Sequence, residues 1–314
     1  MGLLSLIRKF FLHPSSAEEQ VAAVSQTVKP QQVGKFYDTY NDKFVQVYGE
    51  IIQAYRTTDV TKLLDYEAVS MGLAEGMKVC DAGCGVAGPA IYFATKYGVQ
   101  VEGVTVSEVQ CNAANKKIES ARIADKVKVS KQDYHELPSH FGKEVFDVVY
   151  FLESFGHSHD HAKAIQSVWE VLKPGGTLYI KDLFRKLAFY PEHQAKIDYE
   201  IGRINEAYRY NVAELNTVLN ALRVQGFAIM FVKTIDLKLE EFENLTVSND
   251  FQELTGIAKI ENWEEYIFPV DFFEIKCYKP VYDLLYGTDK YFLQNLYWMQ
   301  VHKKQQQELD YGKL

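Results

Sequence analysis

The spacing of hydrophobic and polar positions divides the chain into a helical opening and an alternating part. From residue 16 to residue 70, apolar side chains recur three and four positions apart, which predicts helices. From Met77 onward, short apolar runs alternate with segments of helical spacing. The predicted strands are 78–81, 99–104, 126–130, 145–152 and 177–181, and the predicted helices are 89–97, 108–122 and 161–172. Such alternation predicts an α/β fold with a parallel sheet covered on both faces.

The alternation pauses after the fifth predicted strand. Apolar side chains at helical spacing predict a helix over 191–209, inserted above the edge of the sheet. The pattern then predicts a helix at 213–223 and strands at 227–233 and 272–277. We therefore expect five regions: a helical N-terminal segment that covers the site (1–72), an α/β core (73–183), an inserted cap helix (184–212), the remainder of the core with insertions (213–280) and a C-terminal helix (281–314).

A glycine-rich loop follows the first predicted strand. Gly83, Gly85 and Gly88 separate this strand from the next helix, and a Cβ there would obstruct both the turn and a ligand. The spacing also matches the dinucleotide fingerprint, with Glu102 where that fingerprint places an acid, and a tight turn without a ligand is a further alternative. Asp81 favours a different ligand, because a carboxylate at this position repels pyrophosphate and attracts an ammonium group. S-adenosylmethionine (SAM) carries such an ammonium group, so the loop indicates SAM as the cofactor.

Several motifs in this region resemble those of class I SAM-dependent methyltransferases. These motifs are Asp-x-Gly-x-Gly at 81–85, Phe-Asp-Val-Val at 146–149 and Lys-Pro-Gly-Gly at 173–176. Two further segments, 36–44 (Phe-Tyr-Asp…Asn-Asp-x-Phe) and 103–110 (Gly-Val-Thr-Val-Ser-x-x-Gln), resemble the cyclopropane fatty-acid synthase and sterol methyltransferase branch. The resemblance covers about residues 34–183 and implies a Rossmann-like SAM-binding core. Phe36 replaces the histidine of that branch.

The same resemblance implies roles for individual cofactor residues. Tyr37 would contact the methionyl end of SAM, the residues around Thr105 would line the ribose, and Asp133 would accept from the adenine amino group. From the residues alone, Tyr37 could equally be a core residue, Thr105 a helix cap and Asp133 the end of a turn. The expected cofactor set is Tyr37, Asp81, Gly83, Gly85, Thr105, Val106, Gln110, Asp133 and Tyr134.

Glu153 directly follows the fourth predicted strand. Ligands of open α/β sheets bind outside the carboxyl ends of the strands, so this carboxylate faces the site or caps the next helix. Residues 151–160 resemble the Glu-Ser stretch of methyltransferases that alkylate a carbon–carbon double bond, including sterol and prenyl diphosphate C-methyltransferases. That reaction leaves a carbocation, which aromatic faces stabilise and a base must deprotonate. The candidate catalytic residues are Glu153, His157, His193 and Tyr40.

Five basic residues, from the end of the fifth predicted strand to the end of the inserted helix, could bind a diphosphate, because arginine in particular binds phosphate with two hydrogen bonds. A solvated helix face is the alternative interpretation. Related prenyl methyltransferases require Mg²⁺, but no ligand set is evident in this sequence. The five residues are Lys181, Arg185, Lys186, Arg203 and Arg209.

These features together predict a C-methyltransferase that acts on an alkene of an isoprenoid diphosphate, with or without cyclisation. The alternatives are an O-, N- or C-methyltransferase of another natural product, a SAM-binding scaffold without activity, and an NAD-dependent oxidoreductase. The composition is that of an ordinary globular protein with a substantial core, since 47% of the 314 residues are hydrophobic. The net charge of −8 disfavours nucleic acid and anionic membrane as partners. Homo-oligomerisation stays open.

The cysteine content and the N-terminal sequence indicate in which cellular compartment the protein is expected. The four cysteines show no zinc-like pairing and no disulfide framework, which favours buried thiols and a reducing cytoplasm. The apolar run at 1–12 is interrupted by two basic residues and is too short to cross a bilayer. We therefore expect no transmembrane segment.

Overall fold

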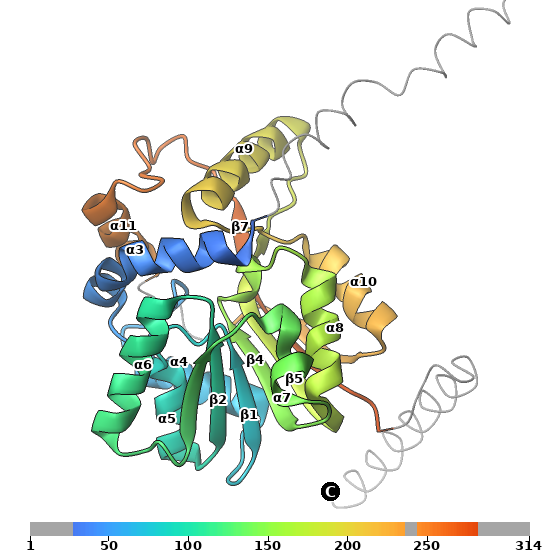
Figure 1. The fold of residues 1–314 in the computed structure, drawn as a ribbon. Coiled ribbons are helices and arrows are strands. Elements are labelled where there is room, and N and C mark those ends of the chain that lie inside the picture. Colours follow the sequence, from blue (N-terminus) through green and yellow to red (C-terminus); the bar gives the residue numbers. More distant parts are fainter. Residues whose placement is uncertain (1–27, 236–243, 282–314) are drawn as a thin grey trace, which may run out of the picture.

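A single seven-stranded sheet organises the computed structural model (Figure 1). The structure describes residues 28–235 and 244–281, with side chains from 249 onward in the second range. The apolar run at 1–12 and the predicted C-terminal helix at 281–314 therefore lie outside the described residues, apart from residue 281 itself. Within the described ranges, the predicted α/β fold with helices on both faces of the sheet is confirmed.

The strand order places a crevice at the centre of the sheet. The order is β3-β2-β1-β4-β5-β7-β6, with β1 to β5 parallel and β7 antiparallel to both of its neighbours. Because the order reverses between β1 and β4, a ligand is expected outside the carboxyl ends of these two strands. The strands are β1 (Lys78–Ala82), β2 (Gln100–Thr105), β3 (Val127–Lys131), β4 (Phe146–Leu152), β5 (Leu172–Arg185), β6 (Ala228–Lys233) and β7 (Val270–Tyr278).

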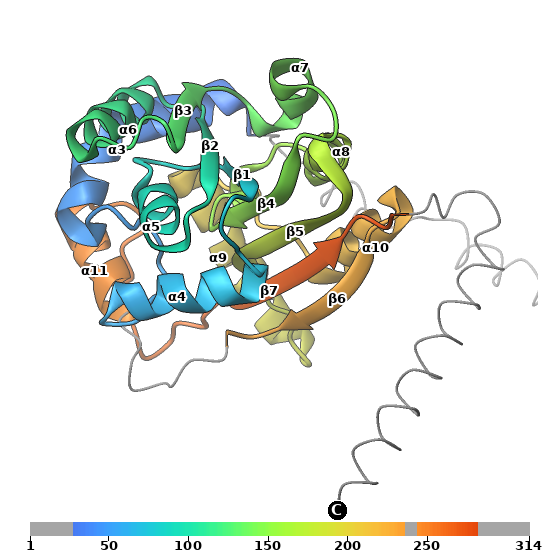
Figure 2. The same cartoon turned by 90° about the horizontal axis from the view of Figure 1, so that it is seen from below.

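The helices form two layers and a cover. In the first layer, α4, α5 and α6 bury one face of the sheet, and in the second, α7, α8 and α10 bury the other (Figure 2). The helices are α3 (Pro30–Tyr48), α4 (Val60–Met71), α5 (Gly88–Tyr97), α6 (Glu108–Ala121), η1 (Tyr134–Glu136), α7 (Leu137–Phe141), η2 (Phe155–His157), α8 (His161–Val171), α9 (Pro191–Tyr208), α10 (Leu215–Gln225) and α11 (Asn244–Thr255). The predicted insertion at 191–209 corresponds to α9.

Helix α3 passes over the carboxyl ends of the strands and packs closely on the loop after β2 (Figure 1). A Cβ on Gly34 would lie 2.5 Å from the carbonyl oxygen of Val106, so only glycine allows this approach. Asp38 accepts hydrogen bonds from the Ser107 hydroxyl at 2.6 Å and from the Val109 amide at 3.1 Å. These contacts fix α3 at the start of α6 and make the N-terminal helix part of the crevice.

Aromatic packing joins α3 to α11. The Phe44 and Phe251 rings stack with centroids 4.2 Å apart, and both side chains are buried. Phe36, where the sequence departs from the family histidine, packs edge-on against Phe44 and Tyr208. Helices α3, α9 and α11 thus form a cover that shares an aromatic interior.

One strand is longer than the sequence predicts. β5 begins at Leu172, not at 177, and extends to Arg185. Its first residue pairs with Phe146 across an irregular register, and its last residue pairs with Val270 of β7. The antiparallel partner comes from almost a hundred residues further along the chain, so local sequence carries no sign of this extension.

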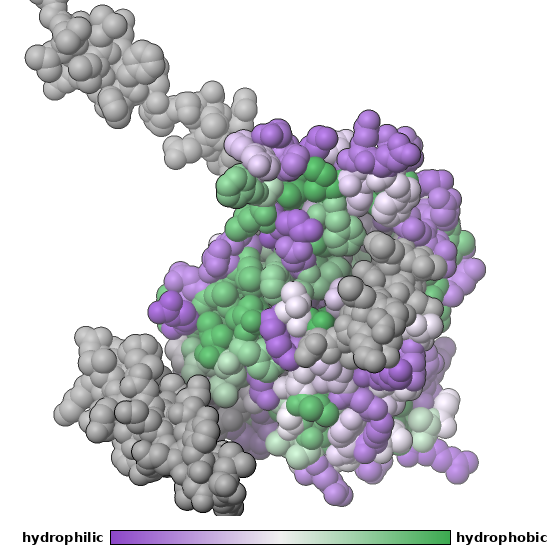
Figure 3. All heavy atoms as spheres, turned by 180° about the vertical axis from the view of Figure 1, so that it is seen from behind, coloured by the Kyte–Doolittle hydropathy of each residue, from purple (hydrophilic) through white to green (hydrophobic). Residues whose placement is uncertain are grey.

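The surface opposite to the view of Figure 1 mixes polar and apolar side chains (Figure 3). Val224 of α10 and Met230 of the edge strand β6 are 74% and 59% exposed. Within the described ranges, no helix has the length and apolar character needed to cross a membrane.

The first residue of α5 provides a test of the packing between helix and cover. A Cβ on Gly88 would lie 2.1 Å from the Glu50 carbonyl oxygen, so Gly88→Ala should lower the free energy of unfolding by about 1–3 kcal/mol. The matched control is Gly202→Ala in α9, where nothing lies within 4 Å of the added Cβ. There alanine should raise stability by about 0.5–1 kcal/mol. Equal effects of both changes in denaturant titrations would contradict the predicted contact.

Candidate active site

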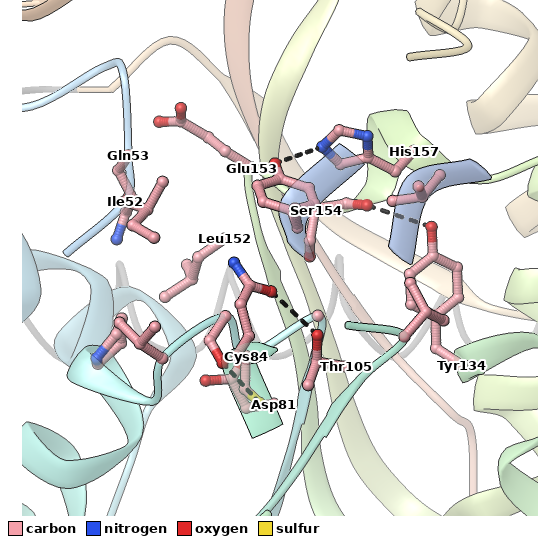
Figure 4. A pocket seen from close by; sticks show the side chains of 18 of the residues that line it. Ile52, Gln53, Asp81, Cys84, Thr105, Tyr134, Leu152, Glu153, Ser154 and His157 are labelled. Carbon is pink, nitrogen blue, oxygen red and sulfur yellow. Dashed lines mark hydrogen bonds between the residues drawn. The ribbon is translucent and has the colours of Figure 1, made fainter. Parts of the chain in front are cut away.

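A cavity of about 730 Å³, including its open mouth, lies at the carboxyl ends of β1, β2 and β4. The glycine loop and β1 form one wall, and the segment after β4 forms another (Figure 4). We refer to it as the cofactor cavity. Its lining includes eight of the nine predicted cofactor residues, namely Tyr37, Asp81, Gly83, Gly85, Thr105, Val106, Gln110 and Tyr134.

The glycine loop is too crowded for larger residues. Gly83 has φ +98°, and a Cβ on it would lie 2.4 Å from the Ser154 Cβ. The amides of Gly83 and Cys84 both donate to the Val104 carbonyl at 2.9 Å, which holds the loop against β2. Gly85 also has a positive φ of +53°. At Gly83 and Gly85 the loop therefore presents bare backbone to the cavity.

Asp81 brings a buried carboxylate to this wall. The residue is 2% exposed, and its Oδ2 has no hydrogen-bond partner in the described part of the chain. Burial raises the pKa of Asp81 to about 7. The Tyr150 hydroxyl lowers this pKa only in part. A buried carboxylate oxygen without a hydrogen-bond partner is costly unless a cation approaches it. The ammonium group of SAM would satisfy this need.

The end of β2 and the loop after it supply polar side chains to the cavity wall, where the family resemblance places the ribose. The Thr105 hydroxyl donates to Gln110 Oε1 at 3.1 Å, and both side chains are buried (Figure 4). Ser107 caps α6 by accepting from the Gln110 amide at 3.1 Å. Capping thus orients Gln110 toward Gly85, and a Cβ on that glycine would lie 3.8 Å from the side-chain nitrogen of Gln110.

Of the two residues predicted to lie beside the adenine, Tyr134 lines the cavity and Asp133 does not. Tyr134 lines the cavity and donates from its hydroxyl to the Ser154 carbonyl at 3.2 Å. Asp133 is not among the described lining residues, because its carboxylate accepts from the His135 amide at 3.0 Å and contacts Nδ1 of that ring at 2.5 Å. Gln132 lines the cavity in its place. It directly follows β3 and could have been predicted from that position.

A second cavity, of about 1050 Å³, adjoins the first under the cover. We refer to it as the acceptor cavity. Both cavities are lined by Tyr37, Ile52 and Glu153, so they meet at these three residues. Nine aromatic side chains line the acceptor cavity: Tyr37, Phe44, Tyr48, Tyr208, Tyr210, Trp263, Tyr266, Phe268 and Phe272.

A tyrosine–histidine pair lies where the cavities meet. The Tyr37 hydroxyl is 2.8 Å from His157 Nε2, and His157 Nδ1 is 2.9 Å from the Arg209 carbonyl oxygen. Because a carbonyl only accepts, Nδ1 carries the proton and Nε2 accepts from Tyr37. Burial lowers the pKa of His157 to about 4 and raises that of Tyr37. His157 is therefore a neutral imidazole with a fixed tautomer.

Glu153 is buried and already fully engaged. Its carboxylate accepts from the amides of Ala54 and Tyr55, at 2.6 and 3.1 Å, and from Lys181 Nζ at 2.6 Å. The residue has φ +57°, a conformation that only surrounding structure can maintain. Glu153 lines both cavities. Its carboxylate already accepts three hydrogen bonds, so the structure does not support a role for Glu153 as the base that removes a proton. It instead anchors the segment after α3.

Lys181 was predicted to bind phosphate, and this prediction is wrong. The residue is 0% exposed, with Nζ bound to Glu153, Gln53 and the Tyr55 carbonyl and lying 3.5 Å from a Glu67 carboxylate oxygen. A cation enclosed by these partners cannot meet a substrate phosphate. The sequence shows the charge of Lys181 but not its partners, which come from distant segments.

The other four predicted cations do not form one phosphate site either. Arg185 pairs with Asp198, and Lys186 lies 3.3 Å from Asp271. Arg203 lines the acceptor cavity but pairs with Glu200 at 2.9 Å. Arg209 caps α9 with a positive φ and contributes its carbonyl to His157.

Two predicted catalytic residues lie away from both cavities. Tyr40 packs against Phe36 with ring centroids 5.2 Å apart, and His193 is exposed on the first turn of α9. Neither is among the described residues that line a cavity. Tyr40 lies one helical turn from Tyr37, so the sequence places both on the same side of α3. In the structure Tyr40 packs into the aromatic interior of the cover and does not reach either cavity.

The strand order and the Asp-x-Gly-x-Gly cavity define a class I SAM-dependent methyltransferase fold. The sequence model of the mycolic acid cyclopropane synthetase family matches residues 31–273. The chain belongs to this family and is a SAM-dependent methyltransferase.

Named relatives include both O- and C-methyltransferases. The chain is 35% identical over 161 residues to 27-O-demethylrifamycin SV methyltransferase of Amycolatopsis mediterranei, covering 49% of this chain and 58% of that relative. It is 28% identical to sterol 24-C-methyltransferase ERG6B of Gibberella zeae, covering 70% of this chain and 60% of the relative. The matches thus span about three fifths of the length of each of these two relatives.

Solved structures share the fold at low sequence identity. The [4+2]-cyclase SpnF superposes with a TM-score of 0.66 and 23% identity, covering 81% of this chain and 97% of the other. A geranyl diphosphate methyltransferase structure gives a TM-score of 0.65 and 17% identity, covering 80% and 100%. At these identities the likeness shows the fold alone.

Asp81 should control SAM affinity. Asp81→Asn removes the charge that faces the ammonium group, so affinity should fall by about 1.5–3 kcal/mol, roughly 10-fold or more. The pKa of about 7 means that wild-type affinity should rise as the carboxyl deprotonates between about pH 6 and pH 8. The variant should lose this pH dependence in calorimetric titrations with SAM.

The acid control for that experiment is Glu102→Gln in β2, because Glu102 does not belong to the described cavity lining. It should bind SAM like wild type. If Asp81→Asn bound SAM as tightly as wild type, Asp81 would not be the group that binds the ammonium of SAM.

Lys181 should matter for stability. Lys181→Met leaves Glu153 and Glu67 buried without their cation, which should lower the free energy of unfolding by about 3–5 kcal/mol. Lys186→Met, at a partly exposed ion pair, should cost at most about 1 kcal/mol. Denaturant titrations of both variants check this, and near-wild-type stability of Lys181→Met would contradict it.

Proposed function

We propose that the protein methylates a carbon–carbon double bond of a bulky, apolar, isoprenoid-type acceptor. The observation that carries this proposal is the junction of the two cavities at Tyr37, Ile52 and Glu153. On one side of the junction lie the glycine loop and Asp81, and on the other lies the aromatic cavity. An acceptor there would present its double bond to the methyl group.

The aromatic lining suits a reaction through a carbocation. SAM supplies an electrophilic methyl group when bound. Attack by an alkene transfers positive charge to the acceptor, and the faces of aromatic rings attract such charge. Tyr37 lies at the junction, and Tyr210 stacks on His157 with centroids 4.0 Å apart. The apolar walls also exclude water, which would otherwise add to the cation.

His157 is the base that this geometry favours. The acceptor would lose a proton to the Tyr37 oxygen while the Tyr37 hydroxyl proton moves to His157 Nε2, 2.8 Å away. The Arg209 carbonyl then holds the charged ring through Nδ1. A relay is needed because Tyr37, with its raised pKa, does not ionise beforehand. Cyclisation of the cation before proton loss is compatible with the same residues.

The structure supports a diphosphate group on the substrate less well than it supports an apolar acceptor. Among the described residues that line the acceptor cavity, Arg203 is the one cation, and Glu200 neutralises it. The carboxylates there, Glu153 and Glu200, are both paired, so they do not form the free oxygen set that Mg²⁺ prefers. We propose no step through Mg²⁺. An acceptor hydroxyl fits better, since it could accept from Arg203 and donate to Glu200.

O-methylation of a bulky natural product is the second candidate. The Tyr37–His157 pair favours it, because the same relay could deprotonate an acceptor hydroxyl as the methyl group is transferred. The two candidates differ in the bond that is formed, so product analysis separates them.

The test is incubation with labelled SAM and geranyl, farnesyl and geranylgeranyl acceptors, each as the alcohol and as the diphosphate. We expect a new C–CH₃ bond, identified by mass spectrometry and NMR, with the alcohols preferred. A methyl ether would support the second candidate. No methylated product from any of these acceptors would count against the isoprenoid proposal.

The same assay tests the base. His157→Gln should reduce turnover by about 10²–10⁴-fold and leave SAM affinity near wild type. His193→Gln, on the exposed turn of α9, is the matched control and should keep full turnover. Full turnover in His157→Gln would exclude the proposed relay.

A further inference from the structure

Two histidines and an aspartate converge beside the cofactor cavity without forming part of it. Asp133 and His135 lie on the segment after β3, and His159 lies on the segment after β4. One ring nitrogen of each histidine and one carboxylate oxygen of Asp133 lie within 4.8 Å of one another. The methyl-transfer reaction proposed above uses none of these side chains.

The hydrogen bonds around the cluster hold His135 in place. His135 is 4% exposed, its Nε2 lies 2.7 Å from the Ser158 hydroxyl, and its Nδ1 lies 2.5 Å from Asp133 Oδ1. The His159 ring is adjacent, with its centroid 3.9 Å from that of His135. Its Nδ1 is buried and has no hydrogen-bond partner among the described residues. A buried donor or acceptor without a partner indicates a missing ligand.

We propose that Asp133, His135 and His159 bind one divalent transition-metal ion of the Zn²⁺ class. Two imidazole nitrogens and one carboxylate oxygen form a donor set typical of zinc sites. The same set disfavours Mg²⁺ and Ca²⁺, which prefer oxygen ligands. The ion would lie among the three ligand atoms, which are within 4.8 Å of one another, and would give Nδ1 of His159 a partner.

Ser158 is suited to support the ion through His135. When Nδ1 of His135 binds the metal, Nε2 carries the proton and donates to the Ser158 hydroxyl oxygen. Without metal, Nδ1 carries the proton and donates to Asp133. Metal binding would therefore move the ring proton of His135 from Nδ1 to Nε2 and replace the Nδ1–Asp133 hydrogen bond with bonds from both groups to the ion.

The ion would connect two segments that shape the cofactor cavity. Tyr134, between two of the proposed ligands, lines that cavity and packs against the His135 ring at 4.7 Å. Ser154 and His157, from the segment of His159, line it as well. The metal site is thus placed to fix the adenine side of the cavity, independently of which acceptor the enzyme uses.

The experiment titrates chelator-treated full-length protein with Zn²⁺ alone by calorimetry. Wild type should bind one equivalent, and His159→Ala and Asp133→Asn should each weaken binding by at least ~10-fold. His159→Cys should restore tight binding, because a thiolate is also a zinc ligand. The control is His140→Ala, which removes an exposed histidine of the same region that bonds to Ser130.

Co²⁺ gives a spectroscopic readout on the same samples. Wild type should show visible absorption from the bound ion, and His159→Ala should lose it. Circular dichroism of metal-free His159→Ala checks that the variant is folded. Absence of stoichiometric Zn²⁺ binding in wild type, or wild-type binding by both His159→Ala and Asp133→Asn, would overturn the proposal.

Discussion

A buried ion pair between Glu153 and Lys181 connects the two halves of the active site. Glu153 also accepts from the amides of Ala54 and Tyr55, so the charge pair fixes the segment after α3 to the end of β4. Burying two charges is costly, and good geometry with further hydrogen bonds is what offsets that cost. Both cavities depend on this attachment, because Ile52, in the same segment, lies where they meet.

Burial and hydrogen-bond partners give the ionisable residues of the site different charges and different availability to a ligand. Asp81 keeps an unpartnered oxygen at the cofactor cavity, whereas the Glu153 carboxylate accepts three hydrogen bonds and its charge is paired with Lys181, so Asp81 is the better placed of the two to offer a charge to a ligand. His157 stays neutral because burial opposes its protonation, and the Arg209 carbonyl selects its tautomer. Similar residue types thus perform different tasks in the same cavity.

Similarity of fold says more about the cofactor of this protein than about its acceptor. A [4+2]-cyclase and a geranyl diphosphate methyltransferase both superpose on this chain, although their names describe different reactions. Such folds host many chemistries, and the site decides among them. Under the proposed function, the acceptor would lie in the aromatic cavity beneath the covering helices of this chain.

The sequence alone determined the alternating sheet and most of the cofactor cavity. The glycine loop, Asp81 and the loop after β2 are close together in the chain, so local spacing encodes their geometry. By contrast, Gln53, a partner of Lys181, lies 128 residues before it in the chain. The end of β5 at Arg185 pairs with Val270, which is also distant in the sequence. Only the tertiary structure therefore decided which charged side chains are paired with an opposite charge. Such pairing depends on distances in space between segments that are far apart in the sequence.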